Sequence, residues 1–278
     1  MRPFRSALYL PASNARAMEK AKSLGTDAII FDLEDAVAPA EKSGARQTLM
    51  AALNADYGTR ARIVRINGAD TVWGHADLAA FGNHPNVDAI LLPKVNAPQD
   101  LDISATRPLW AMIETALGVL NAAAIASHPD LQGMVMGTND LAHEINSRFR
   151  PDRLALQTGL GLCVLAAKAH GQVILDGVYN AFKDDDGLRA ECEQGRDLGF
   201  DGKTLIHPAQ LAIANRAFAP SDAEIDLARR QIDAFDAALS AGLGVAVLDG
   251  KIVENLHILT AKALLAKAAA VAQLEDAR

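Results

Sequence analysis

Cysteine is scarce in this chain of 278 residues, which contains two, Cys163 and Cys192. Their spacing matches no metal-binding motif, and so few thiols argue against a scaffold held together by disulfides. Cys163 lies in the apolar run LGLCVLAAKA, where we expect a buried thiol. The simplest inference is a reduced protein of the cytoplasm.

Long apolar runs and an excess of positive charge are also missing. No segment approaches the roughly 18 consecutive apolar residues that span a membrane. The apolar stretch near the N-terminus is too short for a signal peptide, and Pro11 interrupts it. We therefore expect no membrane contact. The net charge of -7 gives no basic footprint for nucleic acid, although a small basic cluster could still hold an anionic ligand.

Short apolar runs alternate with helix-like segments along most of the chain. The runs are ALYLP, AIIFD, RIVRI, AILLP, LWAMI, GMVMG, QVILD and KTLIH. This alternation favours a (β/α)8 TIM barrel as a catalytic domain over residues 1–219, with an open doubly wound sheet as the main alternative. Residues 220–278 are expected to form a helical extension and lid. There, Ser221 and Glu224 fit a capping box that begins a charged helix over residues 221–241.

Ionisable residues follow the apolar runs, where strands of the predicted barrel end. They are Asp32, Glu34, Asp35, Arg65, Lys94, Glu114, Asp140, Asp176 and His207. In a barrel of this kind these strand ends meet at one face, where active sites are built. Because several of the residues are acids, we expect a cation to offset their mutual repulsion.

Glu114 and Asp140 are the strongest candidates for metal ligands. Each carboxylate comes just after a short apolar run, in PLWAMIET and GMVMGTND. Two carboxylates leave a small hard cation most of its coordination positions for water and substrate oxygens, which suits Mg²⁺, with Mn²⁺ as the second candidate. The alternative is that they are two unrelated acids at the starts of solvated loops.

Residues near this pair could bind the substrate. Arg65 could clamp a carboxylate through two parallel hydrogen bonds, or it could instead neutralise Glu34 or Asp35. Asp35 could order metal-bound water. The stretch Gly137, Thr138, Asn139 and Asp140 resembles the start of a helix. Its backbone N–H groups could receive a ligand carboxylate, the alternative being simple N-capping by Asn139 or Asp140.

Two further residues have an open interpretation. Lys20 lies four residues after Arg16, on the same face of the first predicted helix, where the two could hold phosphates or remain solvated. His207, which precedes Pro208, could act as a general base or could shape its loop.

The ordered motifs LYLPASN…EK, FDLEDAVAP, VRING, LPKV, IET, GTNDL, GKTLIHPAQ and AVLDGKIVEN cover almost the whole chain. Together they resemble the citrate lyase beta-subunit-like family of CoA-ester lyases, within the HpcH/HpaI aldolase group. Members include malyl-CoA, methylmalyl-CoA and citramalyl-CoA lyases and malyl-CoA thioesterases. The resemblance implies a (β/α)8 barrel, CoA thioester and 2-oxo acid substrates, and a homotrimer or hexamer.

The resemblance also implies roles for particular residues. Glu114 and Asp140 would be the Mg²⁺ ligands, Arg65 the contact to the keto-acid portion, and the amides around Asn139 and Asp140 the receptor of its carboxylate. The positions that correspond to CoA contacts are Tyr9, Asn14, Lys20, Ile206 and His207. Asn14 departs from the arginine found at that place in some malyl-CoA lyases, which leaves its phosphate contact open.

Glu254 in DGKIVEN marks a second departure. Related lyases often place an aspartate there and supply it to the active site of the neighbouring subunit, and the glutamate is one methylene longer. The preceding AGLG gives this segment the freedom to close as a lid. From this resemblance we predict a Mg²⁺-dependent lyase that cleaves a 3-hydroxyacyl-CoA into an acyl-CoA and a 2-oxo acid, with Glu254 as the group that transfers a proton.

Four alternatives stay open at this point. A malyl-CoA thioesterase would need the same metal and the same CoA pocket. The chain could also be the beta subunit of a citrate lyase complex, an aldolase of free 2-oxo acids, or a non-catalytic binding barrel.

Overall fold

The computed structural model describes residues 2–277, which form two compact units. Residues 4–218 make one unit, and residues 219–277 with residues 2 and 3 make the other. Each is described here by itself. Within residues 2–277, no helix combines the length and the apolar composition that crossing a membrane would require.

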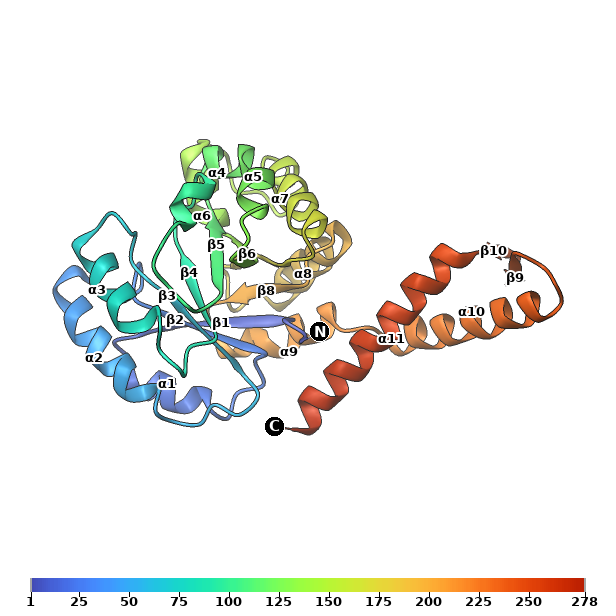
Figure 1. Cartoon of the computed structure of the whole chain (residues 1–278), viewed down its shortest axis with the longest axis horizontal. Coiled ribbons are helices and arrows are strands. Elements are labelled where there is room, and N and C mark those ends of the chain that lie inside the picture. The colour runs from blue at the N-terminus through green and yellow to red at the C-terminus, as the bar shows by residue number, and fades with distance from the viewer. Residues whose placement is uncertain (1, 278) are drawn as a thin grey trace. The chain divides into compact units, whose positions relative to one another are not determined.

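The first unit is a closed barrel of parallel strands, as predicted (Figure 1). The strands are β1 (Ser6–Pro11), β2 (Ala28–Asp32), β3 (Ala61–Arg65), β4 (Ala89–Leu92), β5 (Leu109–Ile113), β6 (Leu131–Met136), β7 (Val173–Asp176) and β8 (Gly202–Leu205). They pair in chain order, and β1 pairs with β8 to close the ring. The alternative of an open doubly wound sheet is therefore wrong.

Helices lie outside the strands and cover the barrel (Figure 1). The α-helices are α1 (Ala15–Ala21), α2 (Lys42–Ala52), α3 (Val72–Phe81), α4 (Ala116–Leu120), α5 (Ala122–Ala126), α6 (Thr138–Glu144), α7 (Gln157–Ala169), α8 (Asp185–Leu198) and α9 (Leu211–Phe218). Short 3-10 helices are η1 (Pro39–Glu41), η2 (Pro98–Leu101) and η3 (Pro208–Gln210).

Side chains fill the barrel interior, so it is a packed core and not a pore. The interior cluster consists of Ala7, Ala28, Ile30, Ala61, Ile63, Ala89, Leu91, Trp110, Met112, Val135 and Leu175. Trp110 is the bulkiest of them, and a Cβ added at Gly133 on the adjacent strand would overlap its indole ring. The Trp110 side chain therefore requires glycine beside it. These side chains occupy the interior, and the C-terminal ends of the strands, where active sites of such barrels are built, lie at one end of it.

The second unit contains two long helices and a β-hairpin. Its elements are α10 (Asp222–Ser240), β9 (Ala246–Leu248), β10 (Lys251–Val253) and α11 (Asn255–Asp276). The predicted capping box is confirmed, since Glu224 Oε2 accepts from the Ser221 N–H at 2.8 Å and the Glu224 N–H donates to Ser221 Oγ at 3.3 Å.

The sequence analysis did not predict the hairpin. Asp249 and Gly250 turn between β9 and β10 with φ values of 50° and 75°. An Asp-Gly pair flanked by apolar residues is a strong signal for a tight hairpin turn, and AVLDGKIV carries it. Glu254 follows directly after β10, is exposed, and precedes α11.

Candidate active site

The C-terminal ends of the barrel strands surround a cavity of about 300 Å³. Its lining residues are Tyr9, Asp32, Asp35, Ala36, Arg65, Met112, Glu114, Met136, Gly137, Thr138, Asn139, Asp140, Val178, Asn180, Thr204 and Ile206. The barrel thus brings together most of the residues that the sequence singled out. The pattern of strand ends did not single out Met112, Met136, Val178, Asn180 or Thr204, because it considered only charged groups.

Glu114 follows β5 and is only 2% exposed. Its Oε1 accepts a hydrogen bond from the Lys94 N–H at 2.8 Å. Burial, together with the charges of Glu34 and Asp140, raises the pKa of Glu114 to about 8. A Cβ at Gly137 would overlap the Glu114 side chain, so glycine lets the end of β6 approach this carboxylate closely.

Asp140 lies in the first turn of α6, is exposed, and lines the same cavity as Glu114. Its negative charge contributes to the raised pKa of Glu114, so the two carboxylates are close enough to repel each other. A small hard cation between them would remove this repulsion and favour the ionised form of Glu114. No group of three or more His, Cys, Asp or Glu side chains is arranged to hold a metal ion in the part of the chain that the structure describes.

Arg65 at the end of β3 is surrounded by acids. Its Nε and Nη2 donate to Asp32 Oδ1 and Oδ2 at 2.7 and 2.6 Å. Its Nη1 lies 2.9 Å from Glu34 Oε2 and 3.3 Å from Asp35 Oδ2. Asp32 therefore makes the two-hydrogen-bond contact that we expected a substrate carboxylate to make. A substrate contact by Arg65 would use Nη1.

Glu34 is a mostly buried acid beside Arg65. Burial, opposed by the Arg65 charge and assisted by the Asp35 and Asp32 charges, raises its pKa to about 7. The Asp35 side chain, in contrast, is 62% exposed and lines the cavity. The Asp35 carboxylate is therefore accessible to water at the opening of the cavity, as its predicted role in ordering metal-bound water requires.

The segment from Gly137 to Asp140 offers fewer free amides than its sequence suggests. The Gly137 N–H donates to the Ile113 carbonyl at 3.0 Å and belongs to the barrel. The N–H groups of Thr138, Asn139 and Asp140 open the first turn of α6, where no preceding helical carbonyl is placed to receive them. Simple capping by Asn139 or Asp140 is wrong, because Gly137 is the N-cap residue and both residues belong to the first turn of α6 itself.

The predicted CoA contacts do not all lie together. Tyr9 and Ile206 line the cavity, whereas Asn14 and Lys20 lie at the two ends of α1. Asn14 Oδ1 accepts from the Ala17 N–H at 3.0 Å and caps this helix. Exposed His207 accepts from the Ala209 N–H at 3.2 Å through Nδ1, so its ring shapes the start of η3. Their contacts to CoA stay predictions.

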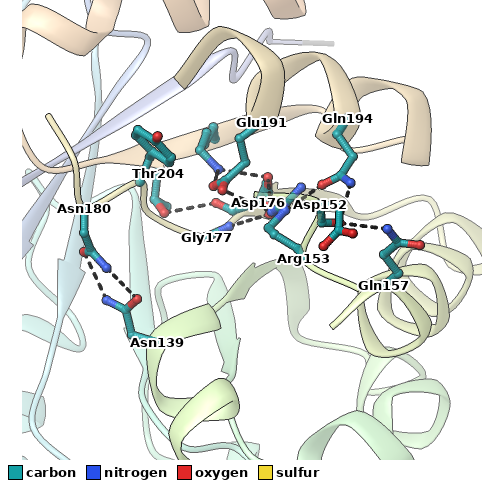
Figure 2. Close-up of polar contacts among 12 residues, drawn as sticks. Asn139, Asp152, Arg153, Gln157, Asp176, Gly177, Asn180, Glu191, Gln194 and Thr204 are labelled. Atoms are coloured by element: carbon teal, nitrogen blue, oxygen red, sulfur yellow. Dashed lines mark hydrogen bonds and ion pairs between the residues drawn. The ribbon is translucent and has the colours of Figure 1, made fainter. Parts of the chain in front are cut away.

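Asp176, which the sequence placed at the rim, is fully buried. It accepts from Arg153 Nη1 at 2.7 Å (Figure 2) and from Lys203 Nζ at 2.9 Å, and these positive charges hold its pKa below the usual range against the effect of burial. Its carbonyl oxygen also accepts from Thr204 Oγ1 at 3.0 Å. Asp176 therefore positions Thr204 in the cavity wall and does not itself face the ligand.

Comparison with known proteins identifies relatives over nearly the full length. The HpcH/HpaI aldolase/citrate lyase family matches residues 5–208. The chain is 68% identical over 275 residues to a (3S)-malyl-CoA thioesterase of Cereibacter sphaeroides, which covers 97% of this chain and 96% of that protein. It is 32% identical over 302 residues to an L-malyl-CoA/beta-methylmalyl-CoA lyase of Cereibacter sphaeroides, which covers 96% and 95%. The crystal structure of CitE from Mycobacterium tuberculosis in complex with magnesium, acetoacetate and coenzyme A matches with a TM-score of 0.83 and 30% identity, covering 96% of this chain and 98% of that one.

Proposed function

The chain belongs to the HpcH/HpaI aldolase/citrate lyase family, and from this premise we propose that it is a Mg²⁺-dependent thioesterase that hydrolyses (3S)-malyl-CoA to malate and CoA. The main support for the thioesterase over the lyase is the 68% identity to a thioesterase of that name, compared with 32% to the malyl-CoA lyase. In this reaction the oxygen of water bonds to the thioester carbon, the carbon–sulfur bond breaks, and the sulfur leaves as the CoA thiol.

Glu114 and Asp140 would hold the Mg²⁺. The raised pKa of Glu114 and the repulsion between the two carboxylates supply the structural reason for this pair, and the magnesium bound to the CitE protein supports Mg²⁺ as the metal. When bound, the ion offsets negative charge on the substrate oxygens. Asp35, exposed at the mouth, orders water near it.

Other residues of the chain would bind the two ends of the substrate. The N–H groups of Thr138, Asn139 and Asp140 receive the malyl carboxylate, and Arg65 Nη1 contacts the same acyl group. The cavity of about 300 Å³ suits this small acyl group, so CoA extends out of it. The residues proposed to hold CoA are Tyr9, Asn14, Lys20, Ile206 and His207.

Glu254 would complete the site from a neighbouring copy in a homotrimer or hexamer. Its carboxylate would remove the proton from the attacking water. The methylene that distinguishes it from the aspartate of related lyases changes its reach, which agrees with a water as its target.

The lyase that the sequence analysis favoured is the second candidate. The 32% identity to a malyl-CoA lyase supports it, and it uses the same metal and the same cavity. There the bond between the carbinol carbon and the acetyl carbon breaks, giving acetyl-CoA and glyoxylate.

One incubation separates the two reactions. Purified protein is mixed with (3S)-malyl-CoA and Mg²⁺, and free CoA thiol, malate, acetyl-CoA and glyoxylate are followed by mass spectrometry. Equal amounts of malate and CoA are expected. Acetyl-CoA and glyoxylate in their place would establish the lyase. Since no other chain is added, turnover also argues against a citrate lyase beta subunit that requires partners.

Replacing Arg65 by lysine tests its proposed substrate contact. Lysine keeps the charge but loses the planar fork in which Nε and Nη2 hold both Asp32 oxygens while Nη1 points to another partner. We expect kcat/KM to fall by about 10- to 100-fold, as for loss of a hydrogen bond to a charged group, with a rise in KM. Thermal unfolding provides the control. A lower Tm with unchanged KM would mean that Arg65 only forms a structural ion pair with Asp32 and does not contact the substrate.

A further inference from the structure

A second cavity lies beside the first in the barrel unit, and it is larger, at about 430 Å³. It lies between α6, the connection from α6 to α7, the segment after β7 and the first turns of α8. The two cavities share Thr138, Asn139, Val178 and Asn180 among their lining residues. These four residues therefore form the wall between the two cavities.

The Asn139 and Asn180 side chains join across this wall (Figure 2). The Asn139 Nδ2 donates to Asn180 Oδ1 at 3.3 Å, and the Asn180 Nδ2 donates to Asn139 Oδ1 at 2.8 Å. Thr138, another residue of the wall, is tightly packed, because a Cβ at Gly177 would overlap its side chain. Two neutral, exposed hydrogen bonds stabilise such a contact by only about 1 kcal/mol each. The amide pair is thus the weak part of the wall.

The chemistry of the second cavity differs from that of the first. Most of its lining is apolar, including Ala142, Phe149, Pro151, Ala155, Leu156, Val178, Ala181 and Ala190. Its charged lining residues are Arg148, Arg150, Arg153 and Glu191. The Glu191 carboxylate is already engaged by Lys203 Nζ at 2.7 Å, and the Arg150 guanidinium is paired with Asp152, to whose carboxylate its Nε and Nη2 donate at 2.9 and 2.7 Å. Unlike the acid-rich first cavity, this one favours a group with an apolar stem and a negative end.

The surroundings of Arg153 also favour a ligand group with a negative end. It is 7% exposed, and its Nη1 and Nε are taken by Asp176 and Gln194. Its Nη2 has no hydrogen-bond partner within residues 2–277. Figure 2 shows Arg153 well separated from the Asn139–Asn180 pair, with Asp176 and Gly177 between them. An unsatisfied buried donor is costly, and an anion provides the strongest acceptor for it.

We propose that the Asn139–Asn180 pair sets the acyl specificity of the active site, by closing it against a second cavity suited to longer acyl groups that end in a carboxylate. This inference rests on the proposed function, in which the malyl carboxylate binds at the start of α6, on the near side of the pair. An acyl group with additional methylenes between its carbinol carbon and its carboxylate would have to pass the pair, and its carboxylate would then meet Arg148 and Arg153 on the far side.

Replacing Asn180 by alanine tests the wall, with Asn180→Leu as the matched variant that removes the amide but keeps bulk. The probes are (3S)-malyl-CoA, 3-hydroxyadipyl-CoA, which has two more methylenes before the carboxylate, and 3-hydroxyhexanoyl-CoA, which lacks the terminal charge. The ratio of kcat/KM for 3-hydroxyadipyl-CoA to kcat/KM for malyl-CoA should be about 10-fold higher in the alanine variant than in the wild type, the gain expected from burying two methylenes. In the leucine variant this ratio should stay at the wild-type value.

Arg148 provides the test of charge. In the Asn180→Ala background, Arg148→Gln should reduce the preference for 3-hydroxyadipyl-CoA over 3-hydroxyhexanoyl-CoA. Titration calorimetry with free malate and free 3-hydroxyadipate gives a readout independent of turnover. The proposal is overturned if folded Asn180→Ala protein keeps the wild-type preference between the two thioesters in hydrolysis and between the two free acids in binding. If the wild type does not hydrolyse malyl-CoA but the alanine variant still gains affinity for 3-hydroxyadipate, the thioesterase assignment is wrong and the proposed role of the Asn139–Asn180 pair is supported.

Discussion

Glu114→Ala and Asp140→Ala should each lower the turnover of malyl-CoA by on the order of 10³-fold, because each removes one of two carboxylates proposed to hold the Mg²⁺. Excess EDTA should silence the wild-type protein, and Mg²⁺ or Mn²⁺ should restore its activity. The measurement is initial CoA release at a series of Mg²⁺ concentrations. Full activity in excess chelator would rule out a metal-centred mechanism.

Glu114→Gln separates the loss of the metal from a loss of the fold. Burial and the charges of Glu34 and Asp140 raise the pKa of Glu114 from 4.5 to about 8, so without a cation this carboxyl retains its proton at neutral pH more than a free one does. The folded state then binds more protons than the unfolded state between these values, and the stability of the metal-free wild type should fall as the pH rises through this window. Neutral glutamine lacks this dependence. In EDTA, Glu114→Gln should therefore unfold at a Tm equal to or above that of the wild type at pH 8.5, yet gain no activity from Mg²⁺.

Glu254→Gln should lower turnover by about 10²- to 10⁴-fold, the range expected when a general base is lost. Glutamine preserves the size of the side chain, and Glu254 is exposed at the start of α11, so the variant should fold normally. Its affinity for Mg²⁺ in titration calorimetry should remain that of the wild type, because neither metal ligand is altered. Near-normal turnover would remove Glu254 from the mechanism.

Mixing inactive variants shows whether Glu254 acts across a subunit interface. Glu254→Gln protein has intact Glu114, and Glu114→Ala protein has intact Glu254. After subunit exchange in an equal mixture, up to about a quarter of sites would combine the two intact residues if sites are shared between copies. We expect activity to rise toward that fraction of the wild-type value. If native mass spectrometry demonstrates exchange and activity stays absent, the shared-site proposal is wrong.

The sequence by itself determined the strands of the barrel and their order along the chain. AIIFD became β2, RIVRI overlaps β3 and LWAMI became β5, because strands buried on both faces are mainly apolar and this pattern is local. It also placed Glu114 and Asp140 at one face, since the ends of parallel barrel strands meet there wherever the helices lie. The capping box at Ser221 was similarly readable, because its partner Glu224 is only three residues away.

Only the tertiary structure decided which of these groups face the ligand. Asp32 lies opposite Arg65 through the register of β2 and β3, so the guanidinium fork is occupied from within. Asp176 ends a strand like the others, yet Lys203 and Arg153 hold it buried. Asn139 and Asn180, separated by 41 residues, meet across a cavity wall. Local apolar periodicity fixes where a strand ends, but the direction and partners of its last side chain depend on strand register and on loops packed from elsewhere in the chain.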